Sequence, residues 1–179
     1  GVQTCALPIS VKETVYQATA YLGIGRVRDF LEAANEILAQ QGVPLPLPPQ
    51  GTTDAATRFS AGLEKQVQLF GPGMAARQTD CPPLRRNVNR WLAANCFGDY
   101  YTRGGLSDAE REMITFCFLL AQGRCENQLR GHTAGNFGVG NGPEKLYSVV
   151  EQCLPYIGYP RSLNAMQIID ETAQKFEAK

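Results

Sequence analysis

The sequence lacks several features on which whole classes of protein depend. Its 179 residues include a single histidine, and 17 basic side chains balance 17 acidic ones, so the formal net charge is zero. Proteins that bind nucleic acid or an anionic membrane surface usually carry excess Lys and Arg, and a zinc site built on paired histidines needs more than one. A transmembrane helix needs about 18 consecutive apolar residues, and no such run is present. We therefore expect no nucleic-acid partner, no membrane partner and no metal.

The six cysteines also lack a common pattern, because none of them is spaced as Cys-x-x-Cys. Cys96, Cys117 and Cys153 lie in apolar periodic segments, where a free thiol behaves as a small hydrophobic group. This usage is typical of a reducing, cytoplasmic compartment rather than of a disulfide scaffold. A chain of this length that is 44% hydrophobic can bury a large core without such staples.

What the sequence does contain is helical periodicity, and we predict an all-α fold. Ser107 and Glu110 form a capping box before the apolar run 113–121, which indicates a buried helix over 107–122. No alternating pair of strands is evident. Four further apolar stripes at helical spacing are Phe30-Ala34-Ile37-Leu38, Phe59-Leu63-Val67-Phe70, Leu84-Val88-Trp91-Leu92 and Leu146-Val149-Val150-Cys153, and a fifth is Leu163-Met166-Ile169-Ala173-Phe176.

Two stretches without helical periodicity and one internal repeat indicate how the chain is divided. Prolines make 43–50 an extended connector, and Gly and Pro make 71–83 a loop. Residues 17–26 resemble residues 152–161, and in both copies we expect a glycine to end one helix before the next begins. The matching residues, each pair separated by the same 135 positions, are Gln17, Tyr21, Gly23 and Arg26 with Gln152, Tyr156, Gly158 and Arg161.

The single histidine leads to the candidate chemistry. Cys125, Gln128 and His132 are spaced to share one helix face, which Asn136 continues. His132 is a candidate general acid or base, since an imidazole titrates near neutral pH. Glu112 lies early in the preceding helix, where its carboxylate would orient His132. The alternatives are a structural histidine and a solvated Glu112, and Cys125 is either a reactive thiol or an idle one.

These residues lie in motifs that resemble the carboxymuconolactone decarboxylase family. The motifs are Leu106-Ser-Asp-Ala-Glu-Arg-Glu-Met, Ala121-Gln-Gly, Gln128-Leu-Arg-Gly-His132, Val150-Glu-Gln and Tyr156-Ile-Gly-Tyr-Pro160. The resemblance covers about 106–170 and extends weakly to 15–35. It implies the helical fold of alkylhydroperoxidase D and a homo-oligomer, either a trimer or a hexamer.

The resemblance also implies two chemistries, neither with a cofactor. The peroxidase branch needs a Cys-x-x-Cys pair, but Gln128 stands where the second cysteine should follow Cys125, which argues against peroxide turnover. The decarboxylase branch needs a proton carrier and an anion site. We therefore expect a lyase for a small carboxylate or lactone substrate, with His132, Glu112 and Cys125 as catalytic candidates. The substrate-binding candidates are Gln128, Arg130 and Arg161. A non-catalytic oligomeric module is the remaining alternative.

The repeat suggests how the domains are arranged. GVQTCALPIS has neither the basic start nor the apolar length of a signal peptide. It resembles translated sequencing-adapter DNA, so we expect 1–10 to be foreign to the fold or disordered. Residues 11–41 would be the remnant of a first family unit in a truncated two-unit chain. A connector with two helices would then span 42–105, and 106–179 would form the family unit.

Overall fold

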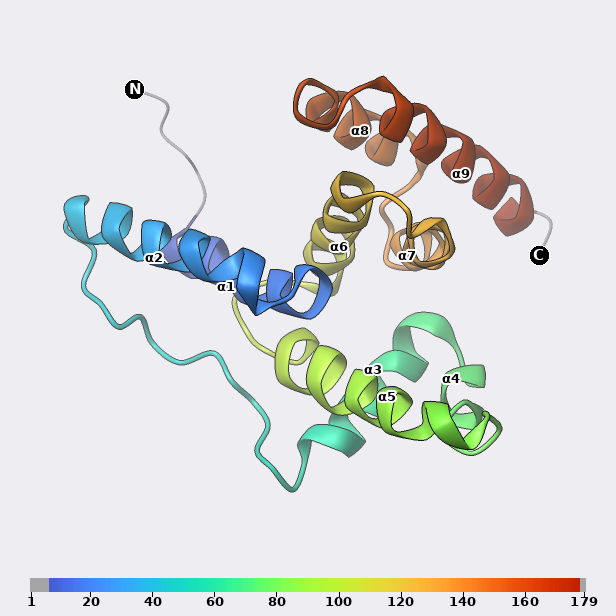
Figure 1. Cartoon of the computed structure of the whole chain (residues 1–179), viewed down its shortest axis with the longest axis horizontal. Helices are drawn as coiled ribbons and strands as arrows, with labels where there is room; N and C mark the ends of the chain where they lie inside the picture. The colour runs from blue at the N-terminus through green and yellow to red at the C-terminus, as the bar shows by residue number, and fades with distance from the viewer. Residues whose placement is uncertain (1–6, 178–179) are drawn as a thin grey trace. The chain divides into compact units, whose positions relative to one another are not determined.

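The structure of the protein, a computed structural model, describes residues 7–177. Every regular element in this part of the chain is a helix, which confirms the predicted all-α class (Figure 1). The helices divide into two compact units, residues 1–107 and 108–179. Among the described residues, no helix combines the length and the apolar character needed to cross a bilayer.

The first unit consists of a helical hairpin and a second, closely packed pair of helices. In the hairpin α1 contacts α2, and in the second pair α3 packs along the π-helix η2. Its elements are α1 (Pro8–Leu22), α2 (Ile24–Gln40), α3 (Arg58–Phe70), α4 (Gly73–Ala76), the 3-10 helix η1 (Pro83–Arg85), α5 (Arg86–Trp91) and η2 (Leu92–Tyr101).

Two glycines allow α3 and η2 to approach at backbone contact. A Cβ atom added to Gly62 of α3 would lie 1.9 Å from the carbonyl oxygen of Ala93. A Cβ atom added to Gly98 of η2 would lie 2.0 Å from the carbonyl oxygen of Arg58. Both obstacles are backbone atoms that cannot rotate away, so only glycine fits at these two positions.

An aromatic cluster forms the core beside this contact. The ring of Phe97 lies 4.7 Å from that of Tyr101 and packs edge-on against Phe70, with their centroids 5.8 Å apart. The hydroxyl group of Tyr21, on α1, donates a hydrogen bond to that of Tyr101 at 3.2 Å. Burying aromatic rings in this way is a large stabilising term, and it holds α1 against η2.

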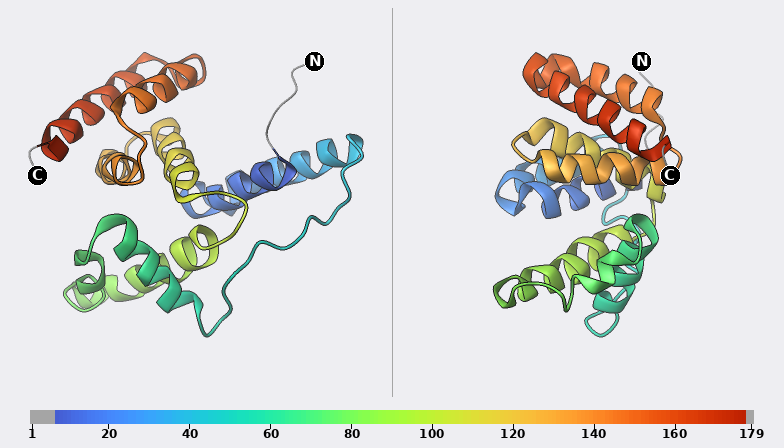
Figure 2. Two further views of the ribbon diagram at one scale, coloured as in Figure 1. Left: turned by 180° about the vertical axis from the view of Figure 1, so that it is seen from behind. Right: turned by 90° about the vertical axis from the view of Figure 1, so that its right-hand side faces the viewer.

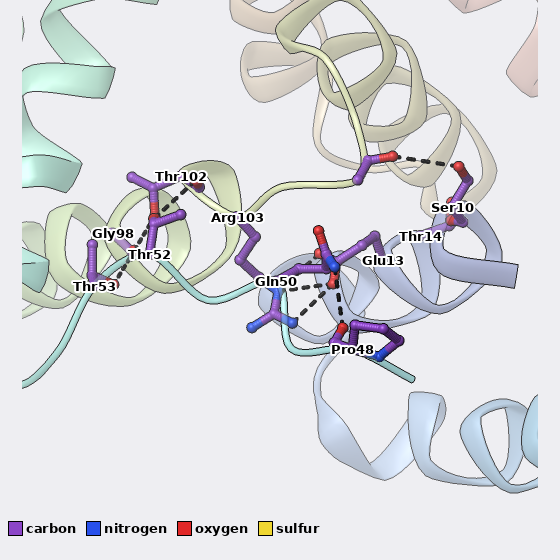
Figure 3. A network of polar contacts seen from close by, with 11 residues as sticks. Ser10, Glu13, Thr14, Pro48, Gln50, Thr52, Thr53, Gly98, Thr102 and Arg103 are labelled. Carbon is purple, nitrogen blue, oxygen red and sulfur yellow. Dashed lines mark hydrogen bonds and ion pairs between the residues drawn. The ribbon is translucent and has the colours of Figure 1, made fainter. Parts of the chain in front are cut away.

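The proline-rich connector is hydrogen-bonded to the end of η2 (Figure 3). The backbone N–H of Gly104 donates to the carbonyl oxygen of Gln50 at 2.9 Å. The hydroxyl groups of Thr52 and Thr53 donate to the carbonyl oxygens of Thr102 and Gly98, at 3.0 and 2.8 Å. Extended chain satisfies few of its own backbone groups, so these bonds fix the connector.

A buried ion pair joins α1 to the same segment (Figure 3). The Glu13 side chain is 1% exposed and accepts two hydrogen bonds from the Arg103 guanidinium, each at 2.8 Å. The Glu13 carboxylate raises the pKa of Arg103. Such a two-pronged pair is specific in geometry, and it sets the position of α1 relative to the end of η2.

The structure of residues 71–101 differs from what the sequence pattern predicts. The stretch 71–83 is not entirely loop, because it contains the short helix α4. The predicted helix through Leu84, Val88, Trp91 and Leu92 is divided among η1, α5 and the start of η2, and these four side chains are exposed. Their helical spacing therefore marks a surface stripe rather than a core face.

The second unit is a bundle of four helices. They are α6 (Asp108–Gln122), α7 (Glu126–Gly138), α8 (Pro143–Ile157) and α9 (Tyr159–Glu177). In Figures 1 and 2, α8 and α9 run side by side as a hairpin, and α6 and α7 both contact α9. The fully buried side chains at their centre include Phe116, Leu120, Leu146, Val150 and Ile169.

The two copies of the repeat adopt the same local structure. α1 and α8 are each 15 residues long and open with proline, and each ends at a glycine with positive φ, Gly23 at 80° and Gly158 at 78°. The surroundings of the repeated tyrosines differ, since Tyr21 hydrogen-bonds Tyr101 whereas Tyr156 is 89% exposed. Duplication therefore stays a prediction. Of the expected foreign segment, residues 1–6 lie outside the described residues, while Pro8 already begins α1.

Candidate active site

The only histidine of the chain lies against a buried carboxylate. His132 on α7 places Nδ1 2.8 Å from Oε2 of Glu112 on α6. The Glu112 side chain is 0% exposed and the His132 side chain 13%. An ionised carboxylate only accepts hydrogen bonds, so the pair fixes the proton on Nδ1. The contact expected between these two residues is present, and proton exchange with a substrate would use Nε2.

Two buried asparagines hold α6 and α7 at this separation. The side-chain N–H groups of Asn136 donate to the carbonyl oxygens of Glu112 and His132, at 3.0 and 2.7 Å. Asn141, in the turn before α8, donates to the Asn136 side-chain oxygen at 2.8 Å and to the carbonyl oxygen of Ala109 at 2.7 Å. The Asn136 amide therefore ties together the backbones that carry both members of the pair.

Replacing Asn136 with aspartate should destabilise the second unit. The isosteric carboxylate keeps the bond from Asn141 but loses both donors to the carbonyl oxygens of Glu112 and His132. We expect a loss of about 2 kcal/mol, since buried groups are left unsatisfied. Urea unfolding followed by circular dichroism measures it. The matched change Asn127→Asp, at an exposed position on the same helix, should cost little. Equal losses in the two variants would contradict the role assigned to Asn136.

The predicted stripe of Cys125, Gln128 and His132 is only partly helical. α7 begins at Glu126, so Cys125 is the residue before the helix, with φ −137°. Its thiol donates to the carbonyl oxygen of Leu119 at 3.3 Å. Gln128 is exposed and His132 is half-buried. The α6–α7 turn, in which Gly123 and Arg124 both have positive φ, therefore moves Cys125 off the helix face.

A cavity of about 230 Å³ opens beside that turn. Cys125 and Arg161 both line it, and the Arg161 guanidinium donates to the carbonyl oxygen of Ala121 at 2.6 Å. Arg124 and Asn164 are also in the wall; sequence reasoning missed both, because neither falls in a motif. The cavity combines two guanidinium groups, the carboxylate of Glu126, a thiol and two amides with the apolar side chains of Leu119, Leu120 and Leu129. His132 and Glu112 are not among its lining residues.

The guanidinium of Arg130, the other candidate for substrate binding, already forms an ion pair. Arg130 donates to Oε2 of Glu171 on α9 at 3.0 Å. Hydrogen bonds from Arg130 and Gln167 lower the pKa of the Glu171 carboxyl. Of the two arginines named from the sequence, Arg161 therefore lies on a cavity and Arg130 in a surface ion pair.

The Cys125 thiol is poorly suited to act as a nucleophile. Its burial, and then the nearby Glu126 carboxylate, raise its pKa. A thiolate rather than a thiol attacks electrophiles. Raising the pKa leaves less thiolate at neutral pH, which agrees with the sequence argument that Gln128 removes the partner of Cys125.

Comparison with known proteins shows which family the chain resembles. Residues 86–171 match the model of the carboxymuconolactone decarboxylase family. This part of the chain is similar to that family. The match starts at α5 and runs through η2 and α6–α8 into α9. It therefore includes His132, Glu112, Cys125 and both candidate arginines. It also begins earlier than the motifs from Leu106 onward indicated.

A curated relative shows the same similarity. A 4-carboxymuconolactone decarboxylase from Acinetobacter baylyi is 28% identical over 115 residues. These residues are 64% of this chain and 85% of the relative. The similarity to the carboxymuconolactone decarboxylase family thus covers α5, η2, α6–α8 and much of α9.

Proposed function

We propose that this protein is a cofactor-free decarboxylase acting on a small carboxylated lactone of the 4-carboxymuconolactone type. The observation that carries the proposal is the His132–Glu112 pair, in which a carboxylate with no solvent exposure lies 2.8 Å from the imidazole. A buried charge is retained when it has a partner, and here that partner is the only imidazole of the chain, the group used most often in general acid–base catalysis.

The chemistry needs one proton and a place for negative charge. When the carbon–carboxylate bond of such a lactone breaks, CO₂ leaves and the bonding electrons remain as a dienolate. His132 as imidazolium gives its Nε2 proton to the dienolate carbon and becomes neutral, and it regains a proton from water. Glu112 stabilises the imidazolium and orients the ring, as general acid catalysis requires.

The anionic substrate also needs a cationic contact, which we assign to Arg161. Its guanidinium lies in the wall of a cavity, whereas that of Arg130 is held by Glu171. A guanidinium binds a carboxylate through two parallel hydrogen bonds. Gln128, which is exposed, is a weaker candidate for substrate binding.

A direct assay tests the proposal. Incubating the purified chain with 4-carboxymuconolactone should release CO₂ and form the decarboxylated lactone without any added cofactor. Chelator-treated protein should react at the same rate. A correctly folded chain that releases CO₂ no faster than buffer would contradict the decarboxylase proposal and favour the non-catalytic module.

The two arginines should differ in their effect on substrate binding. Arg161→Gln should raise KM by about tenfold or more with kcat little changed, because a charge-assisted hydrogen bond is lost equally in the ground and transition states. Arg130→Gln removes the same charge from a surface ion pair and should change KM by less than about threefold. Steady-state kinetics separates the two, and a larger KM effect at Arg130 would reverse the assignment.

If the protein were a thiol peroxidase, it would consume hydroperoxide repeatedly, whereas we expect that it does not. With a hydroperoxide and a dithiol reductant, the degenerate Cys125–Gln128 motif should not sustain turnover, because no disulfide forms within it. Repeated peroxide consumption that disappears in Cys125→Ser would contradict this expectation and favour a thiol peroxidase.

We also propose that the chain is a homo-oligomer. Within the second unit Tyr156, Tyr159 and Leu163 are each at least 60% exposed. Large apolar side chains grouped near one helix turn are typical of interfaces. Light scattering coupled to gel filtration would show a trimer or hexamer, and a monomer at micromolar concentration would contradict the proposal.

A further inference from the structure

Another cavity, of about 370 Å³, lies in the first unit. Its lining residues come from α1, from α2, from the proline-rich connector and from the segment just after η2. Of these residues only Arg103 falls within the part of the chain that matches the family model. The volume is at the lower end of the range for small-molecule sites, and the cavity shares no lining residue with the one that contains Arg161.

The side chain that distinguishes this cavity is Lys12, a cation that is only 8% exposed. Its ammonium group donates a hydrogen bond to the side-chain oxygen of Asn35 and lies 5.3 Å from the centroid of the Tyr16 ring. Neither partner is a carboxylate, and Lys12 forms no ion pair with any residue from 7 to 177. Burying a charge is costly unless an opposite charge accompanies it. An anionic ligand would supply that charge.

Of the lining residues, only Glu13 carries a carboxylate, and it is held by Arg103. Glu13 accepts two hydrogen bonds from the Arg103 guanidinium, each at 2.8 Å. The same guanidinium lies 5.2 Å from the centroid of the Tyr16 ring. Lys12 and Arg103 together with one carboxylate leave the lining with a net charge of +1. The cavity therefore favours a ligand that carries one negative charge.

Asn35 provides a second donor for such a ligand. A lysine ammonium only donates hydrogen bonds, so Asn35 must turn its oxygen toward Lys12. Its side-chain N–H groups are then left without a partner among the described residues. A carboxylate has two oxygen atoms, which can accept from an ammonium and an amide at the same time.

The rest of the lining is mainly apolar and is held in place. The apolar lining residues are Ile9, Leu45, Pro46, Leu47, Pro48 and Pro49. Figure 3 shows how the end of the connector is fixed: the Gln50 side chain donates to the carbonyl oxygen of Pro48 at 3.1 Å, and Gly104 donates to the carbonyl oxygen of Gln50 at 2.9 Å. An apolar wall suits the hydrocarbon body of an organic ligand better than it suits a hydrated inorganic ion.

We propose that this cavity binds a small organic monocarboxylate with an apolar body. The carboxylate pairs with Lys12 and accepts a hydrogen bond from Asn35, while the body packs against the connector. This site binds a ligand without transforming it, and it does not depend on the proposed decarboxylase activity.

The first test compares three small molecules by calorimetric titration of the full chain. Benzoate has both a carboxylate and an apolar ring, so we expect saturable binding of one molecule per chain. Benzamide has the same shape without the charge, and acetate has the charge without the ring. Each should bind at least about tenfold more weakly than benzoate. Benzamide or acetate binding as tightly as benzoate, or no saturable binding of benzoate, would overturn the proposal.

Single variants locate the bound benzoate. Lys12→Met keeps most of the apolar stem but removes the charge, and it should weaken benzoate binding by about tenfold or more while benzamide binding is unchanged. Lys175→Met removes the same charge from an exposed position in the second unit and should have no effect. Arg161→Gln should also leave this site intact. Loss of binding in Arg161→Gln but not in Lys12→Met would assign benzoate to the second unit and contradict the proposal.

Asn35→Asp provides a test that does not depend on losing stability. A carboxylate is compatible with this position, because Asp170, which lies 135 positions further on, accepts a hydrogen bond from Tyr147, the counterpart of Lys12 at the same spacing. The new aspartate would act as an internal anion for Lys12. Benzoate affinity should fall by about tenfold or more, and the melting temperature of the first unit should rise by about 2–4 °C.

The fluorescence of Trp91, which lies in the first unit, reports the melting temperature of Asn35→Asp. If Asn35→Asp bound benzoate as tightly as the wild type, the ligand would not be using the charge of Lys12. If the variant melted at a lower temperature, Lys12 would have no need of an anion. Either result would overturn the proposal.

Discussion

His132→Asn should lower kcat for decarboxylation by about a thousandfold, within the range that general acid catalysis contributes. Asparagine is similar in size and can still reach Glu112, but it cannot carry a proton to the dienolate carbon. KM should change little, because binding is assigned to Arg161 rather than to the imidazole. Steady-state assays of CO₂ release, with circular dichroism to verify folding, would measure the effect.

Two companion variants make this result specific. Glu112→Gln keeps a hydrogen-bond acceptor but removes the charge that stabilises the imidazolium, so we expect an intermediate loss of about tenfold to a hundredfold in kcat. Asn127→Ser changes an exposed side chain on the same helix and should leave kcat unaltered. If His132→Asn retained more than about a tenth of wild-type kcat, the proton donor would have to be another group.

Adding one methyl group at Gly62 or at Gly98 should unfold the first unit or cost it about 3 kcal/mol or more. The new Cβ atoms would lie 1.9 and 2.0 Å from backbone carbonyl oxygens, so α3 and η2 would have to separate. Overpacking of a core usually costs about 1–3 kcal/mol, and a backbone obstacle that cannot rotate belongs at the upper end or above it. The only tryptophan, Trp91, lies in this unit, so its fluorescence during urea unfolding reports the change.

Gly25→Ala is the matched control for both glycine variants. Gly25 lies in α2 with no heavy atom within 4 Å of the added Cβ. Alanine is the better helix former, so this variant should gain about 0.5–1 kcal/mol. If Gly62→Ala and Gly98→Ala were as stable as Gly25→Ala, α3 and η2 would not make the close contact.

The helical class and the central pair were predictable from the sequence because both depend on short-range spacing. Apolar residues at helical spacing predicted the helices. Because the chain has a single histidine, only one imidazole could be proposed. Glu112 could be proposed as its partner because both residues belong to adjacent helices joined by a short turn. The arginine could not be chosen in this way: Arg130 and Arg161 differ only in their neighbours, Glu171 in one case and a cavity in the other.

Other features need the three-dimensional packing. Asn141 lies in a turn, where nothing in its neighbourhood predicts that it will bond two segments of the second unit. The predicted stripe ended at Leu92, so the π-helix η2 was not predicted beyond its first residue. Its close contact with α3 depends on Gly62 and Gly98, which apolar spacing does not reveal.

The burial of Asn141 also affects how the protein ages chemically. Asn141 precedes Gly142, and asparagine followed by glycine is prone to deamidation, because the next backbone nitrogen can reach the side-chain amide and close a succinimide ring. Here the amide is 1% exposed and donates to Ala109 and Asn136, so it is not available to rotate into the reactive position. The hydrogen bonds that align Glu112 with His132 therefore also protect the backbone at 141–142, and deamidation at Asn141 should accumulate only in molecules whose second unit has opened.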